Sequence, residues 1–270
     1  MSGLELLYGT APGRAALRVL TRPGLSRAAG RYLNTALSRV HIAPFVRKNR
    51  IDLTQYGGAP YRSFNDFFTR LILSGLRPFD GAAEALCSPC DGRLTAYELG
   101  EGAAFTVKSV RYDLPALLRD GALAASFAGG WALVYRLCVD DYHRYAWFDG
   151  GAPGPATTLP GVLHTVRPAA TERRPVYCEN SREYVLLQSD RFGPAVQMEV
   201  GAMMVGKISN RPLSARVERG TEKGIFEFGG STVIVLLQAG RAALRPDILA
   251  ASAAGAETRV LQGERVGTAI

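Results

Sequence analysis

The sequence predicts an α+β protein, with helices at the N-terminus and a β-rich remainder. Between Gly24 and Val40 the apolar residues recur at helical spacing, among them Leu25, Leu33 and Leu37. From about residue 86 onward the chain reads as short apolar runs broken by Gly, Pro and Asp, which is typical of strands. The clearest predicted strands are residues 131–139, 183–188, 195–200 and 233–237. Helices first and strands afterwards indicate an α+β arrangement rather than an alternating one.

Length and composition set the size of the core. The chain has 270 residues and is 47% hydrophobic, which is enough for a substantial core in one large domain or a domain with an appendage. No apolar run approaches the roughly 20 residues that span a bilayer, and the N-terminus lacks the apolar core of a signal peptide. We therefore expect the protein to stay in the cytosol.

The positive charge is concentrated at the N-terminus. Residues 1–50 hold nine Arg or Lys against one acid, whereas residues 51–270 hold 23 of each, so the whole formal charge of +8 lies in the first segment. The helix predicted from Gly24 to Val40 carries Arg27 and Arg31 on another face than its apolar residues. Such a helix either lies on an anionic membrane, where each basic residue contributes ~1 kcal/mol, or docks on its own domain. Nucleic acid is disfavoured, because no pattern of stacking aromatic residues accompanies the arginines.

Several shorter elements are also expected. Ser63-Phe-Asn-Asp66 resembles a capping box and predicts a short helix through about Leu73, which Arg77-Pro78 follows. A brief helical piece is expected near residues 114–119, and a loop or short helix at 239–255 before a last strand near 259–266. The cysteines include Cys87-x-x-Cys90, but no second close Cys or His pair completes a zinc site, so we expect reduced structural thiols.

One stretch, KGIFEFGGSTVIVLLQ at residues 223–238, suggests chemistry. Two strand-like runs meet at Gly229-Gly-Ser-Thr232, where the glycines permit a strained corner and leave the Gly230 carbonyl unshielded. Attack by the Ser231 hydroxyl on that carbonyl would replace the peptide bond with an ester. β-Elimination and hydrolysis would then leave a pyruvoyl group at the new amino terminus. Taken alone, Gly-Gly-Ser-Thr between strands is more often an ordinary hairpin or bulge, so the hypothesis needs a base and a carboxylate elsewhere.

The chain has only three histidines as candidate bases. His143 follows the strand predicted at 131–139 and is flanked by Asp141, a candidate orienting carboxylate. His164 lies in another strand-like segment, and His41 lies in the basic helical region without an evident role. Asp91 stands in Ser88-Pro-Cys-Asp-Gly92, where it is either a turn residue or a carboxylate that orients a histidine.

Together these motifs resemble the phosphatidylserine decarboxylases. The resemblance runs from about residue 60 to the C-terminus and rests on ordered motifs: Phe67-Phe-Thr-Arg70, Arg77-Pro78, Ser88-Pro-Cys-Asp-Gly92, Asp141-Tyr-His-Arg144, Glu179-Asn-Ser-Arg-Glu183, Val200-Gly-Ala-Met-Met-Val-Gly206 and Phe226-Glu-Phe-Gly-Gly-Ser-Thr232. It implies self-cleavage between Gly230 and Ser231 into a large chain, 1–230, and a small chain, 231–270. It also implies a covalent pyruvoyl cofactor derived from Ser231 and no metal.

The resemblance assigns roles to the candidate residues. Asp91 and Ser231 match two members of the relay that drives maturation, whereas the usual relay histidine is replaced here by Ala146. We hypothesise that His164 takes its place. His143 matches the histidine linked to decarboxylation. Thr232, with backbone N–H groups at the corner that includes Gly229, would stabilise the oxyanion of self-cleavage.

The implied reaction is decarboxylation of phosphatidylserine to phosphatidylethanolamine through a Schiff base to the pyruvoyl group. A ketone conjugated with an amide takes up the electrons that decarboxylation leaves on the α-carbon, which ordinary side chains cannot do. Three alternatives remain: a pyruvoyl decarboxylase of a soluble amino acid, a serine hydrolase using Ser231, His143 and Asp91, and a catalytically impaired homologue that only binds membranes.

A membrane substrate favours the membrane interpretation of the N-terminus. We expect residues 1–50 to form a basic helical membrane-associating region and residues 51–270 a catalytic domain, whose central strands come partly from the segment after Ser231. The expected location is peripheral, at the cytoplasmic face of the cell membrane, with phosphatidylserine as the partner and no nucleic acid. Members of the family are commonly dimeric, so a homodimer is a further expected partner, although no sequence feature identifies its contact surface.

Overall fold

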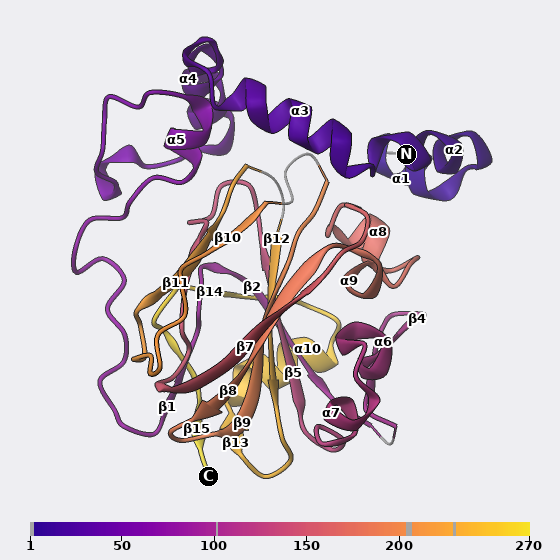
Figure 1. Ribbon diagram of the computed structural model, residues 1–270, viewed down its shortest axis with the longest axis vertical. Helices are drawn as coiled ribbons and strands as arrows, with labels where there is room; N and C mark the ends of the chain where they lie inside the picture. The colour runs from indigo at the N-terminus through magenta and orange to yellow at the C-terminus, as the bar shows by residue number, and fades with distance from the viewer. Residues whose placement is uncertain (1–2, 101, 204–206, 229–230) are drawn as a thin grey trace.

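The computed structural model describes residues 3–100, 102–203, 207–228 and 231–270. Helices form a layer at the N-terminus, which lies along one end of the β-sheets (Figure 1). We call residues 3–68 the helical layer. Its elements are α1 (Gly3–Gly9), α2 (Ala11–Leu20), α3 (Pro23–Leu33), the 3-10 helix η1 (Ala36–His41), α4 (Ile42–Asn49), the 3-10 helix η2 (Leu53–Gln55) and α5 (Phe64–Phe68).

A seven-stranded antiparallel sheet forms the centre of the rest of the chain. Its order is β14 (Thr258–Val260), β2 (Gly92–Glu98), β5 (Trp131–Leu137), β12 (Ser231–Leu237), β9 (Gly193–Val200), β8 (Arg182–Ser189) and β7 (Gly151–Leu159). Strand β12 is therefore the middle strand, although it belongs to the last forty residues of the chain. The prediction that the segment after Ser231 donates a central strand is confirmed.

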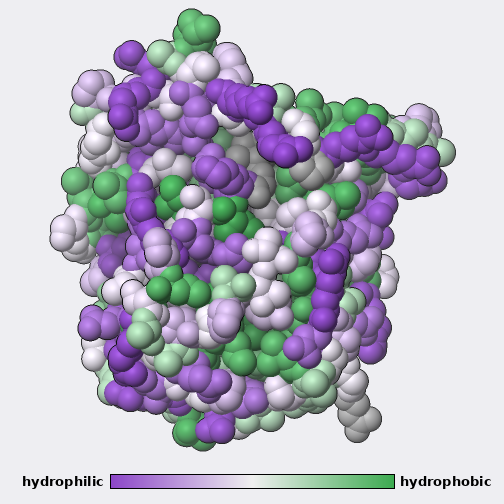
Figure 2. Space-filling view, viewed as in Figure 1, coloured by the Kyte–Doolittle hydropathy of each residue, from purple (hydrophilic) through white to green (hydrophobic). Residues whose placement is uncertain are grey.

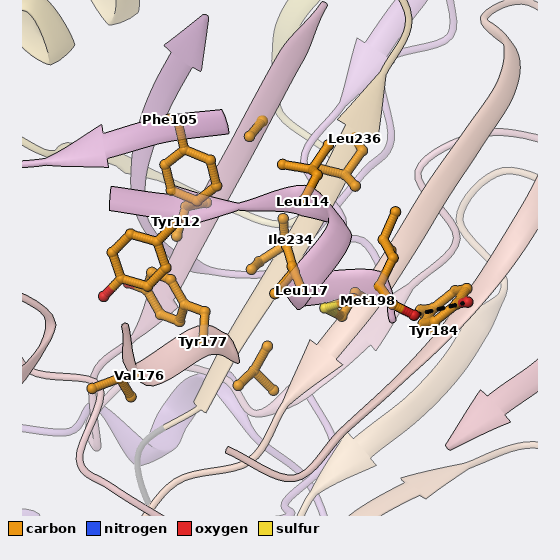
Figure 3. Packing of buried hydrophobic residues seen from close by; sticks show 14 of the residues in the cluster. Phe105, Tyr112, Leu114, Leu117, Val176, Tyr177, Tyr184, Met198, Ile234 and Leu236 are labelled. Atoms are coloured by element: carbon orange, nitrogen blue, oxygen red, sulfur yellow. Dashed lines mark hydrogen bonds between the residues drawn. The ribbon is translucent and has the colours of Figure 1, made fainter. Parts of the chain in front are cut away.

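Both faces of β12 are covered, which explains its wholly apolar sequence. Successive side chains of a strand point to opposite faces. Accordingly Ile234 and Leu236 pack in one hydrophobic cluster with residues of the short helices, as Figure 3 shows for Leu114, Leu117 and Tyr177. Val233, Val235 and Leu237 pack in a second cluster on the other face. All residues of β12 are buried, as the central strand of a sheet packed on both sides requires.

Smaller sheets and helices complete the fold. One three-stranded sheet has the order β1 (Ala85–Cys87), β15 (Arg265–Ala269) and β13 (Ala242–Leu244). A second has the order β10 (Ile208–Asn210), β11 (Glu222–Phe226) and β6 (Arg144–Ala146). Strands β3 (Ala104–Val107) and β4 (Val110–Asp113) form a two-stranded sheet. The remaining helices are α6 (Leu114–Leu118), α7 (Gly121–Ala125), α8 (Pro168–Thr171), α9 (Val176–Glu179) and α10 (Pro246–Ala253). The α+β prediction is confirmed.

Two predicted helices differ in extent from the structure. The helix expected over 24–40 ends at Leu33 and gives way to the separate 3-10 turn η1. The helix expected after Ser63 ends at Phe68 rather than near Leu73, although the Ser63 side chain caps it as predicted by accepting a hydrogen bond from Asp66 N. Cys87 and Cys90 are buried free thiols.

The helical layer is packed onto the β-rich part at two places. Tyr8 and Leu17 join the hydrophobic cluster of Ile234 and Leu236. A second contact is an aromatic cluster that comprises Phe45, Phe64, Phe67, Phe68 and Phe228. Here Phe228 packs edge-on against Phe64, with 4.9 Å between ring centroids. None of the described helices is long and apolar enough to cross a membrane.

Candidate functional site

Ser231 is the first residue of β12 and lies opposite Leu137, the last residue of β5. Its exposed fraction is 1%, and its Oγ has no hydrogen-bond partner in the part of the chain that the structure describes. A buried hydroxyl without a partner costs free energy, so such a group calls for a functional explanation. Gly230, the other predicted cleavage-site residue, and Gly229, predicted to support the site, lie outside the described residues.

Thr232 does not share a face of the sheet with Ser231. It pairs with Arg136 on β5 and Val200 on β9, and the alternation of β12 turns its side chain to the face of Ile234. Its side chain is completely buried. Any help that Thr232 gives to chemistry at Ser231 is therefore expected through its backbone N–H.

His143 lies in the segment between β5, which ends at Leu137 opposite Ser231, and β6, which begins at Arg144. Its Nδ1 lies 2.9 Å from the backbone carbonyl of Asp141. Because a carbonyl can only accept, Nδ1 carries the proton and Nε2 is the basic nitrogen of the neutral ring. The His143 carbonyl accepts from Phe226 N, and the ring packs on Phe68 with 4.1 Å between centroids. His143 is thus held from both the helical layer and β11.

Asp141 orients this segment in a different way from the one the sequence suggested. The contact with His143 Nδ1 is made by the Asp141 carbonyl, whereas its carboxylate accepts a hydrogen bond from Cys138 N at 2.7 Å. Burial raises the pKa of Asp141 to about 6, against the opposing influence of the Cys138 N–H. The carboxylate therefore stabilises the turn that follows β5.

Asp91 is held by an arginine. Arg77 donates its Nε and Nη2 to the two carboxylate oxygens of Asp91 at 2.8 and 2.7 Å, and Gln262 N donates to the same carboxylate. The hydrogen bonds to Asp91 raise the pKa of Arg77. The motif Arg77-Pro78 was visible in the sequence, but its pairing with Asp91 was not, because the two lie on separate segments brought together only in the fold.

His164 is buried in a cluster with Tyr8 and Glu179. The Tyr8 hydroxyl lies 3.1 Å from His164 Nδ1, and a Glu179 carboxylate oxygen lies 3.5 Å from Nε2. Burial lowers the pKa of His164, and Arg174 acts in the same direction. Asn180 connects the backbone of His164 to the end of β9, because its Nδ2 donates both to the His164 carbonyl and to the carbonyl of Gly201, the residue after β9. No hydrogen bond among the described residues joins His164 to Ser231, so its relay role stays a prediction.

A cavity of about 620 Å³ is lined by Leu137, which pairs with Ser231 across the sheet, and by Phe228, although Ser231 itself is not one of its lining residues. Leu137, Cys138 and Phe228 line it from the two segments next to the start of β12, and Leu4 and Asn49 line it from the helical layer. Its other lining residues are Arg136, Val139, Asp140, Thr165, Val166, Arg167 and Met203. A cavity of this size, with mostly apolar walls and a few charged groups, is typical of a ligand site.

A buried ion pair near the site was missed by sequence reasoning. Lys223 on β11 donates to Glu199 on β9, and both side chains are almost completely buried. Asn210 also donates to Glu199, and the Lys223 ammonium lies 5.1 Å from the Trp147 ring. Burial raises the pKa of Glu199, while Lys223 acts against it. The pair fastens β11, which leads toward Ser231, to the neighbour of β12. A charged residue within the apolar strand predicted at 195–200 was the available signal.

Comparison with known proteins decides the family. The model of the family described as phosphatidylserine decarboxylase matches residues 64–268. The chain belongs to the phosphatidylserine decarboxylase family. It is 40% identical over 265 residues to phosphatidylserine decarboxylase proenzyme 2 of Clostridium acetobutylicum, covering 98% of this chain and 91% of that protein.

Further relatives extend the same result. The chain is 36% identical over 273 residues to a phosphatidylserine decarboxylase proenzyme of Ruminiclostridium cellulolyticum, covering 99% and 91% of the two chains. It is 39% identical over 244 residues to one of Desulfitobacterium hafniense, covering 88% and 82%. The family match begins at Phe64 and so leaves out α1 to α4, whereas the similarity to the clostridial phosphatidylserine decarboxylase proenzymes extends over nearly the whole chain. The resemblance inferred from the sequence motifs is confirmed.

Proposed function

We propose that this protein decarboxylates phosphatidylserine to phosphatidylethanolamine with a pyruvoyl group made from its own Ser231. The observation that carries the proposal is the buried, unpartnered Ser231 hydroxyl at the head of the middle strand, whose pairing partner Leu137 lines a cavity. This environment fits the prosthetic group, because a small ketone in place of the unpartnered Ser231 hydroxyl would need no new hydrogen-bond donor. The name proenzyme, borne by the relatives, also supports a chain that matures by cleavage.

Maturation would begin at the Ser231 hydroxyl. Its attack on the Gly230 carbonyl converts the peptide bond to an ester. Loss of the α-proton of residue 231 then releases the carboxylate of residue 230 by β-elimination. Hydrolysis follows, in which the nitrogen of residue 231 leaves as ammonia and the oxygen of water becomes the ketone oxygen. The proton of the hydroxyl must pass to a base, for which Asp91 with His164 remains our proposed relay. Backbone N–H groups at the start of β12 would stabilise the oxyanion.

In the mature protein, the ketone would take up the electrons that loss of carbon dioxide leaves on the substrate α-carbon. The chain's own residues have to position the headgroup, exclude water and return a proton to that carbon. His143 is our candidate proton donor, because the Asp141 carbonyl and Phe68 fix the orientation of its ring. The cavity walls Leu137, Phe228 and Met203 are apolar and would keep water away.

The small chain should remain bound after cleavage. Ile234, Leu236 and the other apolar residues of β12 are fully buried between two neighbouring strands. Each such side chain contributes ~1.5–3 kcal/mol of hydrophobic stabilisation, in addition to the ladder hydrogen bonds. Separation of the two chains would therefore require denaturation.

We further propose that the helical layer rests on the cytoplasmic face of the cell membrane. Leu37 and Val40 of η1 are 75% and 69% exposed, and basic residues such as Arg39 lie among them. Figure 2 shows hydrophilic and hydrophobic residues interspersed over this part of the molecule. Exposed apolar residues beside arginines suit an anionic bilayer surface, and Leu4 and Asn49 of the same layer line the cavity.

The decisive experiment is an intact-mass measurement of the purified protein. We expect two fragments that co-purify, the smaller beginning at residue 231 and reactive toward hydrazine. Ser231→Ala protein should remain a single 29 kDa chain. Turnover should be tested on phosphatidylserine vesicles and on free serine, and activity on serine alone would favour the soluble amino acid decarboxylase. A single uncut wild-type chain without a hydrazine-reactive carbonyl would contradict the proposal.

A further inference from the structure

The cavity that Leu137 and Phe228 line is also lined by an arginine without a described counter-ion. The basic residues of its lining are Arg136 and Arg167. Arg136 is occupied, because its Nε and Nη2 donate to both carboxylate oxygens of Glu257 and its Nη1 donates to Cys138 Sγ. Arg167 donates its backbone N–H to Thr165 Oγ1, but its side chain makes no hydrogen bond or ion pair with the residues that the structure describes. Its charge is therefore available to a ligand.

We propose that Arg167 binds the phosphodiester of the phosphatidylserine headgroup while the amine of that headgroup reacts at residue 231. This inference rests on the proposed function and adds the residue that recognises the phospholipid. Arginine suits the task, because its planar fork can donate two parallel hydrogen bonds to phosphate oxygens.

The covalent structure of the substrate places the phosphate close to the reacting amine. In phosphatidylserine only the β-carbon and an ester oxygen separate the α-carbon from phosphorus. When the amine reaches residue 231, the phosphodiester is only a few bonds away, so we place it in the cavity that Leu137 and Phe228 line. Removing an anion from water costs free energy unless hydrogen-bond donors or a cation in the cavity compensate for the lost hydration. Arg167 is the cation of the lining that no described carboxylate neutralises.

The remaining walls agree with this orientation. Asp140 supplies a carboxylate to the lining, so the cavity offers both signs of charge, as does a headgroup that carries an ammonium group and two anions. Leu4, Val166 and Met203 supply apolar surface for the part of the lipid beyond the phosphate. Leu4 belongs to α1, so the apolar wall continues into the helical layer, from which a membrane lipid would enter.

Binding should be measured first in uncut protein. Ser231→Ala keeps the single chain, and dihexanoylphosphatidylserine below its micelle concentration removes the membrane surface from the measurement. We expect Arg167→Gln in this background to weaken binding in calorimetry by about tenfold or more, as the loss of charge-assisted hydrogen bonds implies. Arg167→Lys should bind with intermediate affinity. The matched control is Arg173→Gln, because Arg173 is also exposed near α8 but does not line the cavity, and it should bind like its parent.

Turnover gives a second readout in the matured enzyme. Arg167→Gln should cleave itself to the normal extent, raise KM for dihexanoylphosphatidylserine by about tenfold and change kcat by less than about threefold, since the arginine contacts a part of the substrate that does not react. Inorganic phosphate at the same concentration as the lipid should not displace the lipid from the cavity of the wild-type protein.

Two results would overturn the inference while leaving the proposed function standing. One is unchanged lipid binding and KM in Arg167→Gln, and the other is equal competition by inorganic phosphate, which would indicate a general anion site. If wild-type protein neither cleaves itself nor decarboxylates the lipid, the proposed function fails, and the inference that rests on it fails too.

Discussion

The ring of Phe68 contacts both the His143 ring and the Phe228 ring, with centroid distances of 4.1 and 4.9 Å. Phe68 belongs to α5, His143 follows β5, and Phe228 precedes Ser231 by three residues. One aromatic side chain of the helical layer therefore supports the candidate proton donor and the segment that leads to the cleavage position. Phe228 is fixed further by its backbone N–H, which donates to Asn65 Oδ1 at 3.1 Å.

Replacing Phe68 with Ala should impair decarboxylation beyond its effect on stability. The void that the missing Phe68 ring leaves in the core should lower the free energy of unfolding by ~3–5 kcal/mol. Because His143 loses the ring that orients it, kcat should also fall, on the order of 10–100-fold. Phe192→Ala is the matched control. Phe192 is equally buried but packs on Phe148, in the hydrophobic cluster that contains Val233, Val235 and Leu237. Equal kcat in the two variants, measured where both are folded, would show that Phe68 only stabilises the fold.

The ion pair of Arg77 and Asp91 allows the relay assignment to be tested. Both side chains are largely buried, so Arg77→Gln should lower the free energy of unfolding by ~3–5 kcal/mol by leaving a carboxylate unpaired. If Asp91 also orients a base, Asp91→Asn should slow self-cleavage much more than Arg77→Gln does. The rate can be followed by gel electrophoresis of freshly translated protein at a permissive temperature. If both variants cleave themselves at the wild-type rate, Asp91 has only a structural role and is not part of the relay.

Local patterns predicted the strands well because burial dictates their composition. The run Val233–Leu237 is apolar on both faces since β12 is the middle strand, and the sequence could show that without its neighbours. The end of α3 at Leu33 was harder to predict, because the apolar spacing continues into η1, where Ser38 is buried and accepts a hydrogen bond from Phe64 N. That contact comes from a distant segment, and it overrides the local helical pattern.

Only part of the candidate site could be predicted, because local sequence patterns do not show contacts between distant segments. Ser231, His143 and Asp91 stand in motifs whose residues follow one another in the sequence, so their importance was visible. Their partners depend on tertiary packing. The fork from Arg77 to Asp91, the Phe68 ring on His143 and the pair of Lys223 with Glu199 each join segments at least fourteen residues apart in the chain. No periodicity or spacing rule encodes such pairs.

His164 provides a further test of maturation. Burial lowers its pKa below 6.5, so the ring is neutral at pH 7 and able to accept a proton. If it is the relay base, His164→Ala should slow self-cleavage by about 100-fold or more. Tyr8→Phe is the control, because it removes the hydroxyl at Nδ1 and keeps the imidazole. A normal cleavage rate in His164→Ala would remove His164 from the relay and leave it as a link between α1 and the sheet.

The carboxyl of Asp141 should make stability decrease with pH. Burial raises its pKa from 3.8 to about 6 in the folded protein. Between these values the folded state binds a proton that the unfolded state has released. Stability from this group is therefore complete below about pH 4 and is lost as the pH rises through about 6, by up to ~3 kcal/mol.

Urea unfolding of the uncut Ser231→Ala protein between pH 4 and 8 measures this effect. Asp141→Asn keeps an oxygen that can accept the Cys138 N–H but cannot ionise, so it should not lose this stability. All other titrating groups are common to the two proteins. The difference between their free energies of unfolding should accordingly grow in favour of Asp141→Asn from pH 4 to 6 and become constant above it. A difference that does not vary with pH would mean that Asp141 ionises in the folded state as it does in water.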